Sequence, residues 1–338
     1  KFFSAGDVVM EDDEKGSGKS VLWRNLIGIA LLVLSGTGLL MPLAQAEPTG
    51  GQISTGTGTI AQAGATTNIT QNTQNLAINW QSFSIGSNEA VRFNQPNASS
   101  IALNRVLGQD PSSILGSLSA NGQVFVLNPN GVLFGTGSQV NVGGLVASTL
   151  SLSDADFMAG NFGFSNSDGT GSVVNQGTLT AAQGGYIALL APEVRNEGVI
   201  SATLGTALLG AGDKVTLNLN NGSLLSYTTD QGSLNALAEN RHLIQADGGQ
   251  VYMSAKAADT LSTAVVNNTG IIEARTLQNH NGDIVLMGDM QVGQVHVGGT
   301  LDASASNGGN GGFIETSAAQ VKVATDAIIT TQASQGIS

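Results

Sequence analysis

Short apolar runs alternate with turn residues along most of this chain. Between positions 121 and 150, runs of β-forming residues at 124–127, 132–134 and 140–146 are separated by turns built from Asn, Pro and Gly. Strands this short, with turns this tight, exclude helix and leave little room for ordinary hairpins. The pattern predicts a chain that bends a few times per coil and stacks each coil on the last.

A repeated motif, Asn-x-Gly-x-Ile/Leu-x-Ala, supports this interpretation. It begins at Asn175, returns 21 positions later at Asn196 and again at Asn268, with a degenerate copy at residues 298–303. A second unit alternates with the motif and carries an apolar run after Gly-Gly or Asn-Gly. Repeats with a period of 20–50 residues are typical of solenoids.

The chemistry of these units predicts a parallel β-helix. We expect Asn or Gly to supply the left-handed bend at each corner, alternate apolar residues to point inward, and small residues to let coils approach. At ~21 residues per coil, the mature chain would form about a dozen coils over roughly 60 Å. A β-sandwich does not predict a repeated unit. A membrane barrel needs aromatic girdles, but aromatic residues are only 4% of the chain.

Several segments depart from the coil pattern. Residues 47–93 look like an N-terminal cap over the open end of the solenoid. We expect residues 154–164, which contain three Phe, to leave the helix as a small protrusion. Residues 224–242 are expected to be irregular, with a short helix at 234–241.

The β-helix pattern continues to the last residue. We interpret residues 94–320 as the main β-helix and residues 321–338 as the start of a further passenger β-helix. The chain is therefore expected to be the front of a longer protein.

The N-terminus has the pattern of an extended secretory signal peptide. An apolar run of about 15 residues at 26–40 follows basic residues, and the small residues Ala44 and Ala46 precede Glu47. We expect residues 1–46 to be removed by cleavage before Glu47. A membrane anchor is the alternative, but the run is short for a bilayer, which needs ~20 residues.

The charge of the chain bears on its possible partners, and its lack of cysteine bears on how the fold is stabilised. The chain has 24 acidic and 12 basic residues, a net charge of −12. An exported acidic protein would repel a phosphate backbone, so no nucleic-acid partner is expected. The chain has no Cys, so its stability cannot come from disulfides.

Several features resemble sites without meeting their requirements. Residues 16–20 resemble the end of a phosphate-binding loop but lack its first Gly and a preceding strand. Residues 308–313 resemble a calcium-binding nonapeptide, but Phe313 stands where a ligand Asp belongs, which favours a tight coil corner. The three histidines are far apart and lack zinc spacing. No metal and no cofactor are expected.

An enzyme is the rival class, because pectate-lyase-like enzymes share the β-helix. They require clustered Asp with Arg or Lys in a groove. Here Asp154 and Asp156 are the only close Asp pair in the mature part, and the basic residues are scattered. No catalytic residues can be assigned. A stand-alone adhesin, which would need no transporter, is a third possibility.

The ordered blocks of the chain resemble the secretion domain of two-partner-secreted exoproteins, the filamentous haemagglutinin-like proteins that include the high-molecular-weight adhesins. The blocks lie at residues 78–80, 83–86, 91–96, 103–106, 114–116, 120–125, 128–131, 134–135, 142–148 and 308–317.

This resemblance implies a right-handed parallel β-helix with an N-terminal cap and extra-helical hairpins. It implies export through the Sec translocon and recognition of the unfolded chain in the periplasm by an outer-membrane transporter of the Omp85 class. The domain would then fold outside a Gram-negative cell and template the region behind it. The whole protein is expected to be an adhesin or haemagglutinin that contacts a host or neighbouring cell through its downstream region. A contact-dependent toxin or haemolysin and a polysaccharide-active enzyme are the alternatives.

The resemblance also implies functional positions. The family's secretion motif corresponds to Asn128, Pro129, Asn130 and Gly131, and secondary motif positions to Asn104, Arg105, Asn121 and Gly122. An Asn-Pro-Asn-Gly turn either shapes the folded coil or contacts the transporter, and the sequence leaves both open. Strand addition to a transporter module is a further mode of recognition, for which the runs at 124–127 and 140–146 could serve as amphipathic strands.

Overall fold

The computed structural model describes residues 47–166 and 169–337. The expected signal peptide, residues 1–46, and the cleavage residues Ala44 and Ala46 lie outside this part of the chain. Within it, no helix has the length and apolar character that a membrane crossing requires.

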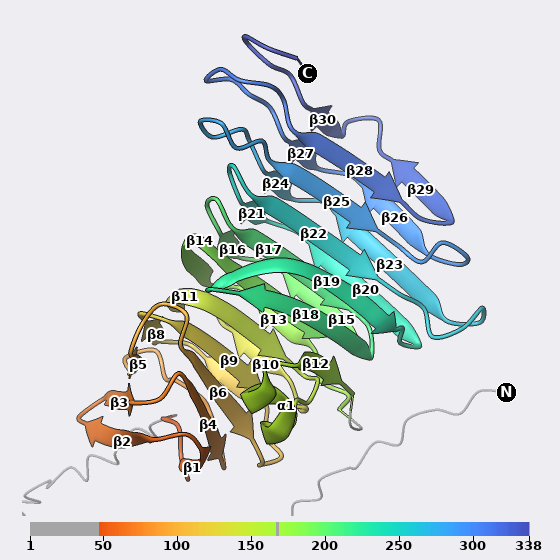
Figure 1. The fold of residues 1–338 in the computed structure, drawn as a ribbon. Coiled ribbons are helices and arrows are strands. Elements are labelled where there is room, and N and C mark those ends of the chain that lie inside the picture. Colours follow the sequence, from red (N-terminus) through yellow and green to blue (C-terminus); the bar gives the residue numbers. More distant parts are fainter. Residues whose placement is uncertain (1–46, 167–168, 338) are drawn as a thin grey trace, which may run out of the picture. The chain divides into compact units, whose positions relative to one another are not determined.

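The described chain folds as a right-handed parallel β-helix whose coils contribute strands to three stacked columns (Figure 1). The first column contains β3 (Thr66–Gln71), β5 (Ala90–Asn94), β8 (Ser117–Ala120), the first halves of β11 (Gln139–Ser148) and β14 (Thr178–Ala191), β16 (Val199–Ser201), β21 (Leu243–Gln245), β24 (Ile271–Glu273), β27 (Thr300–Asp302) and β30 (Ile328–Thr330).

The second column continues from the first because β11 and β14 bend across both. It contains β1 (Gln52–Thr55), β4 (Asn75–Trp80), β6 (Ile101–Val106), β9 (Gln123–Leu127), the second halves of β11 and β14, β17 (Thr206–Ala211), β22 (Gln250–Ala255), β25 (Asp283–Met287) and β28 (Phe313–Ser317).

The third column is a separate parallel sheet of eight strands. It contains β7 (Ser112–Ile114), β10 (Val132–Phe134), β13 (Val173–Asn175), β15 (Glu193–Asn196), β20 (Asn235–Asn240), β23 (Thr263–Asn268), β26 (Gln294–Val297) and β29 (Gln320–Val323).

The N-terminal segment forms the expected cap. β1 pairs antiparallel with β4, and β2 (Gly58–Ala63) pairs antiparallel with β3. From β3 onward the pairing along the columns is parallel. The change of strand direction places a hairpin over the first coil, which satisfies an edge that an open solenoid would expose.

Coil length is not constant, which corrects the expected period. Leu179 pairs with Ile200 at the 21-residue spacing. Further on, Ile244 pairs with Ile272, 28 residues away, and Ile272 pairs with Leu301, 29 residues away. Longer corners lengthen the later coils, so the chain forms fewer coils than the dozen predicted.

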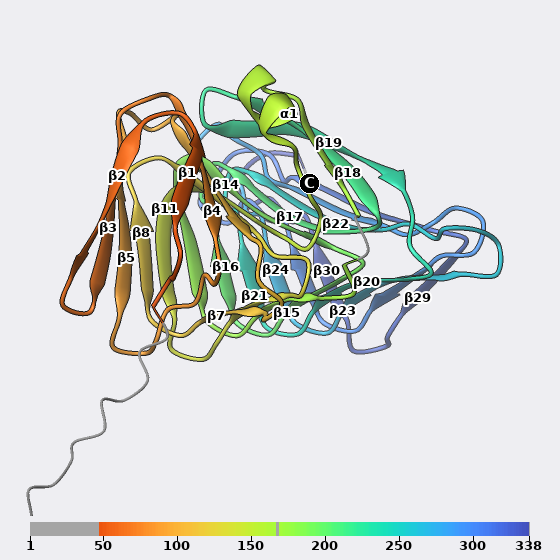
Figure 2. The same ribbon diagram turned by 90° about the horizontal axis from the view of Figure 1, so that it is seen from below.

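The extra residues of two coils fold outside the helix, on one side of the stack (Figure 2). The expected protrusion is confirmed as helix α1 (Asp154–Ala159) followed by β12 (Phe162–Ser165). β12 pairs with β18 (Lys214–Asn220), which forms a hairpin with β19 (Ser223–Gln231). These three strands, from two segments far apart in the sequence, form an antiparallel sheet that we call the outer sheet.

The outer sheet and α1 cover a second hydrophobic core. Phe157, Phe162 and Phe164 surround Phe125 of β9, with ring centroids 6.3, 5.7 and 6.0 Å away. All four rings are buried. Strand β9 is consequently buried on both faces, because its alternate residues face the inside of the helix.

Two expectations for residues 224–242 are wrong. The segment is not irregular, because β19 and β20 occupy most of it. Residues 234–241 are not a helix either, because β20 pairs with β15 and β23 on its two sides. Its alternate residues Ala236 and Ala238 are buried. Pairing within the column overrides the helix propensity of Ala, Leu and Glu.

Candidate functional site

The Asn-Pro-Asn-Gly turn connects β9 to β10 at a corner of the coil. The Gly131 amide donates to the Asn128 carbonyl at 3.0 Å, and the Asn130 amide donates to the Asn128 side-chain Oδ1 at 3.0 Å. Gly131 has φ +123, a conformation that residues with a Cβ rarely adopt. The residue types of the motif therefore fix the local shape of the corner.

The same corner is bonded to the preceding coil. The Asn128 Nδ2 donates to the Asp110 carbonyl and to the Ser112 Oγ, both at 3.0 Å. The Asn130 Nδ2 donates to the Gly108 carbonyl at 3.0 Å. These three bonds hold the turn against the loop that leads into β7.

The following coil completes the attachment. The Gly171 amide donates to the Pro129 carbonyl at 3.1 Å, and the Val132 amide donates to the Ser172 carbonyl at 3.0 Å. The turn is thus bonded to coils on both sides, and a change in its shape would disturb three successive coils.

Exposure separates the two asparagines. The Asn128 side chain is fully buried, at 0% exposure, whereas Asn130 is exposed. In the folded domain only Asn130 is available to another protein. Asn128 can be contacted only while the chain is unfolded.

The secondary positions Asn104 and Arg105 lie in β6, beside β9. The buried Asn104 accepts a bond from the Trp80 Nε1 at 3.0 Å and donates to the Phe125 carbonyl at 3.2 Å. Asn104 therefore joins three successive strands of the second column.

Arg105 reaches outward to the protrusion. Its guanidinium donates to the Leu152 carbonyl at 2.6 Å and to Asp154 at 2.8 Å. Burial favours the neutral form of Asp154, but bonds from Arg105 and Ser54 and the Arg105 charge outweigh it and lower the pKa of this carboxyl. Arg105 holds the start of α1 against the coil.

Asn121 and Gly122 lie at the opposite end of β9 from the turn. The Asn121 side chain accepts from the Gln95 amide and donates to the Gln95 carbonyl, both at 2.8 Å. A Cβ at Gly122 would lie 2.7 Å from the Ser100 carbonyl oxygen. Both residues hold the coils at close approach, but they do not gather with Asn128 into one surface.

The two runs considered for strand addition are not free in the folded domain. β9 is paired with β6 and β11, and β11 is paired with strands on both sides. The run at 124–127 is also not amphipathic, because all five residues of β9 are buried. Neither run offers an edge unless the chain is unfolded.

Sequence reasoning missed a ladder of buried asparagines in the third column. The Nδ2 groups of Asn175, Asn196 and Asn240 each donate to the next Oδ1, at 2.7, 2.8 and 2.7 Å, ending at Asn268. The Asn-x-Gly motif identified three of these four positions, but Asn240 lacks the following Gly. None of the motif asparagines has a positive φ, so the expected left-handed corners are formed not by Asn but by Gly, as at Gly184 (φ +76) and Gly248 (φ +69).

The glycines of the motif permit close coil contact instead. A Cβ at Gly198 would lie 2.2 Å from the Gly177 carbonyl oxygen, and a Cβ at Gly299 would lie 2.0 Å from that of Gly270. No L side chain fits at such distances. The expectation that small residues let the coils approach is confirmed.

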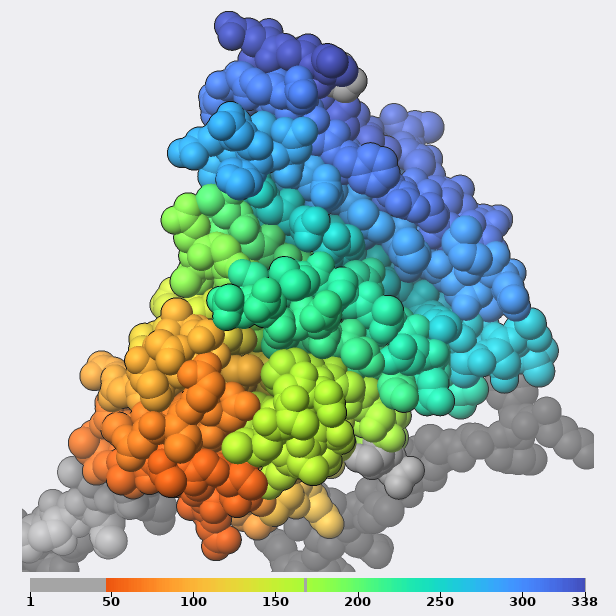
Figure 3. Space-filling view, viewed as in Figure 1, coloured from red at the N-terminus to blue at the C-terminus, as the bar shows by residue number. Residues whose placement is uncertain are grey.

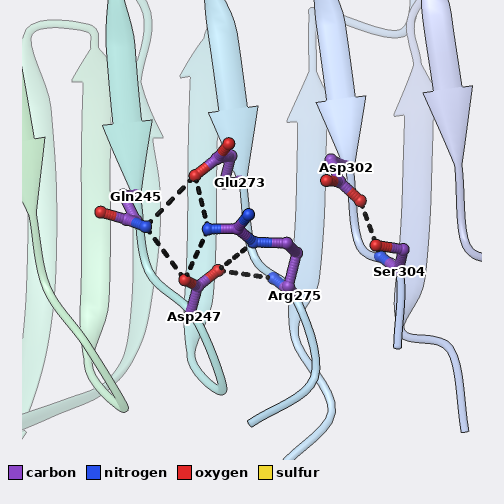
Figure 4. A network of polar contacts seen from close by, with 6 residues as sticks. All are labelled: Gln245, Asp247, Glu273, Arg275, Asp302 and Ser304. Atoms are coloured by element: carbon purple, nitrogen blue, oxygen red, sulfur yellow. Dashed lines mark hydrogen bonds and ion pairs between the residues drawn. The ribbon is translucent and has the colours of Figure 1, made fainter. Parts of the chain in front are cut away.

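Charged residues also connect successive coils. Arg275 bonds Asp247 at 3.0 Å and Glu273 at 2.8 Å, and Gln245 bonds both carboxylates (Figure 4). Burial, together with Asp247 and Asp302, raises the pKa of Glu273 despite Arg275. The described residues hold no group of three His, Cys, Asp or Glu side chains able to bind a metal.

The fold and the corner define a class of protein: a parallel β-helical domain with a cap and an outer sheet, as found in secretion domains. Two crystal structures among those that the chain matches illustrate this fold. The chain is similar to the HMW1 secretion domain from Haemophilus influenzae, with a TM-score of 0.58 and 24% identity over 86% of this chain and 99% of that chain. It is similar to the filamentous hemagglutinin secretion domain, with a TM-score of 0.52 and 16% identity over the same shares.

Sequence comparison gives the family. Residues 44–312 match the model of the TPS secretion domain, so the chain belongs to the two-partner secretion (TPS) domains. Two heme/hemopexin-binding proteins of Haemophilus influenzae are 34% and 33% identical over 77% and 65% of this chain. The matches span 29% and 26% of those proteins.

Membership has direct consequences. TPS domains belong to secreted exoproteins of Gram-negative bacteria, and a TPS domain implies a partner transporter of the Omp85 class. The family is a secretion domain and is not known as catalytic.

Proposed function

We propose that this domain is recognised unfolded in the periplasm by its Omp85-class transporter, after Sec-dependent export and removal of residues 1–46. It then folds at the cell surface and nucleates the β-helix behind it. The observation that carries the proposal is the burial of the family's motif. Asn128 has 0% exposure, and β9 and β11 are paired on both sides. A transporter that uses these segments must meet them before folding.

The column pairing supports nucleation. In the first two columns, each strand from β5 onward pairs in parallel register with the strand of the preceding coil, and the cap pairs with the first of them.

The test compares two states of one protein. The periplasmic modules of the transporter are immobilised, and the domain from Glu47 is applied either prefolded or freshly diluted from urea. We expect binding of the unfolded chain at least about tenfold tighter than that of the folded domain. Equal binding of the folded domain would contradict the proposal. A chain scrambled between residues 124 and 146 controls for non-specific capture.

For the whole exoprotein, we propose adhesion to a host or neighbouring cell rather than catalysis. The close Asp pair of the sequence is not free for catalysis, since Asp154 is bonded to Arg105. Haemagglutination and cell-binding assays on the full-length protein, with the isolated domain as control, test this.

A second candidate is binding of heme or hemopexin by the whole exoprotein. It is favoured because the two curated relatives carry that name. Capture of the full-length protein on hemin or hemopexin resin, but not of an adhesin of the same family, would select this candidate. Retention by erythrocytes without hemin binding would select adhesion.

A further inference from the structure

The outer sheet has an unpaired edge that faces the later coils. β18 lies between β12 and β19, and within the described ranges no strand pairs with the far edge of β19. This edge lies on the face that Figures 1 and 3 show, next to the coils of β22 and β25. Exposed edges of this kind are templates for an additional strand.

One end of the edge is closed by a lysine. The Lys256 Nζ donates to the carbonyls of Thr229 and Asp230, each at 2.9 Å. The stretch from Leu225 to Thr228 remains, and Leu225 is 55% exposed. A strand added here would be limited to a short segment.

A groove of about 620 Å³ separates β19 from the outer surface of β22 and β25. Tyr227 forms its wall, with its ring centroid 5.2 Å from that of Tyr252. Val285 and the exposed Met287 and Met290 line the rest. A strand edge beside an apolar floor is the arrangement that binds extended peptides, because the backbone gives affinity and alternate side chains enter the floor.

The charges around the groove are mostly negative. Asp289 lines it, and burial together with the nearby Asp283 carboxylate raises the pKa of Tyr252 in its floor. Burial raises the pKa of Tyr227 to about 12, and the nearby Glu315 carboxylate acts in the same direction. The one cation lining the described groove, Lys256, is bonded to two carbonyls. A basic occupant is therefore complementary, whereas a second copy of this acidic surface would be repelled.

We propose that this groove binds an extended, basic segment of a partner protein outside the cell, which adds a fourth strand to the outer sheet at β19. Two side chains separated by one residue would enter the floor formed by Tyr252, Val285 and Met287. Wall and floor come from strands far apart in sequence, so the groove exists only after folding. It is distinct from the proposed recognition of the unfolded chain and does not depend on it.

The experiment uses defined peptides and the folded chain from Glu47. The probe is a capped seven-residue peptide of alternating Lys and Val. Its controls are the Glu/Val analogue and a Lys/Val peptide N-methylated on alternate backbone amides, which keeps the charge but removes one edge of donors. We expect binding of the first peptide by calorimetry and a loss of at least about tenfold in affinity for both controls.

A matched pair of variants locates the site. Met287→Lys places a cation in the floor of the groove. Met158→Lys is the control on α1, because Met158 is 45% exposed and Met287 is 40% exposed. We expect only Met287→Lys to lose peptide binding, with unchanged urea midpoints for both variants. Should Met287→Lys fail to fold, Met287→Ala replaces it.

Four results would overturn the proposal. Equal binding of the N-methylated peptide would exclude strand addition, and no binding at millimolar peptide would exclude the site. Sedimentation showing a dimer that Met287→Lys alone dissociates would assign the groove to a second copy. If the peptides do not bind, but hemin binds saturably and Met287→Lys abolishes that binding, the groove would be assigned to a planar ligand.

Discussion

Replacement of Asn128 by alanine tests how the secretion motif works. The variant removes the acceptor of the Asn130 amide and the donor to Asp110 and Ser112. Ser112 is itself fully buried, so its hydroxyl would lose a partner without gaining water. A lost buried partner costs ~1–3 kcal/mol. Because several bonds are lost together, we expect a total of about 3 kcal/mol.

The comparison with Asn130 makes the prediction specific. Asn130→Ala loses the bonds to the Gly108 carbonyl and to the Asn128 Oδ1 at an exposed position and should cost only ~0.5–1.5 kcal/mol. Asn218→Ala, at an exposed position of β18, serves as the control. Urea midpoints of the purified domain give the stabilities. With a slope of ~3 kcal/mol/M, Asn128→Ala should lower the midpoint by about 1 M.

Secreted yield is then measured with the transporter co-expressed. We expect the secreted yield of the three variants to follow their stabilities. Gln278 has a strained φ of +58 far from the turn, so adding Gln278→Gly should stabilise Asn128→Ala and raise its secreted yield. A midpoint unchanged in Asn128→Ala would refute the hydrogen-bond reasoning. A stable Asn130→Ala variant that is not secreted would show that the transporter reads the turn itself.

Three further predictions concern processing, coil contact and pH. N-terminal sequencing of the secreted protein should begin at Glu47, and a start before residue 40 would exclude the signal peptide. Gly198→Ala, which meets a carbonyl of the preceding coil, should cost ~1–3 kcal/mol in urea unfolding, whereas Gly163→Ala, with nothing closer than 3.8 Å, should not. The lowered pKa of Asp154 means that its ionised carboxylate stabilises the fold at pH values above its unfolded-state pKa of ~3.9. This stabilisation is lost as the pH falls through the lower pKa of the folded state. The difference in melting temperature between wild type and Asp154→Asn should therefore be present at pH 6 and vanish at acid pH.

The regular part of the fold could be predicted because its information is local. Short apolar runs between turn residues predicted the strands at 124–127 and 132–134 to within a residue, and the Asn-x-Gly repeat marked successive coils. Each of these residues packs against the equivalent position of the next coil. Because equivalent positions have equivalent neighbours, they carry similar residues, and the coils appear as a repeat in the sequence.

The outer sheet could not be predicted, because its pairings are not repeated. Asn166, which follows β12, and Asp213, which precedes β18, bond to each other although they are 47 residues apart and belong to different insertions. Likewise, β20 was missed because Asn240 keeps the ladder without the Gly that marks the motif elsewhere. Family resemblance gave the motif residues, but only the structure separates the buried Asn128 from the exposed Asn130.

The outer sheet also links residues 214–231 to the secretion motif. Phe162 and Phe164 of β12, whose rings pack on Phe125 of β9, lie opposite Leu217 and Val215 of β18. Removal of β18 would therefore uncover these rings. Apolar burial of one ring is worth ~1.5–3 kcal/mol, so closure of the sheet adds stability to β9 and thereby to the Asn128 corner at its end. A hairpin deletion from 214 to 231 should consequently weaken the Asn128 turn, although the two do not touch, and amide exchange at Gly131 would report it.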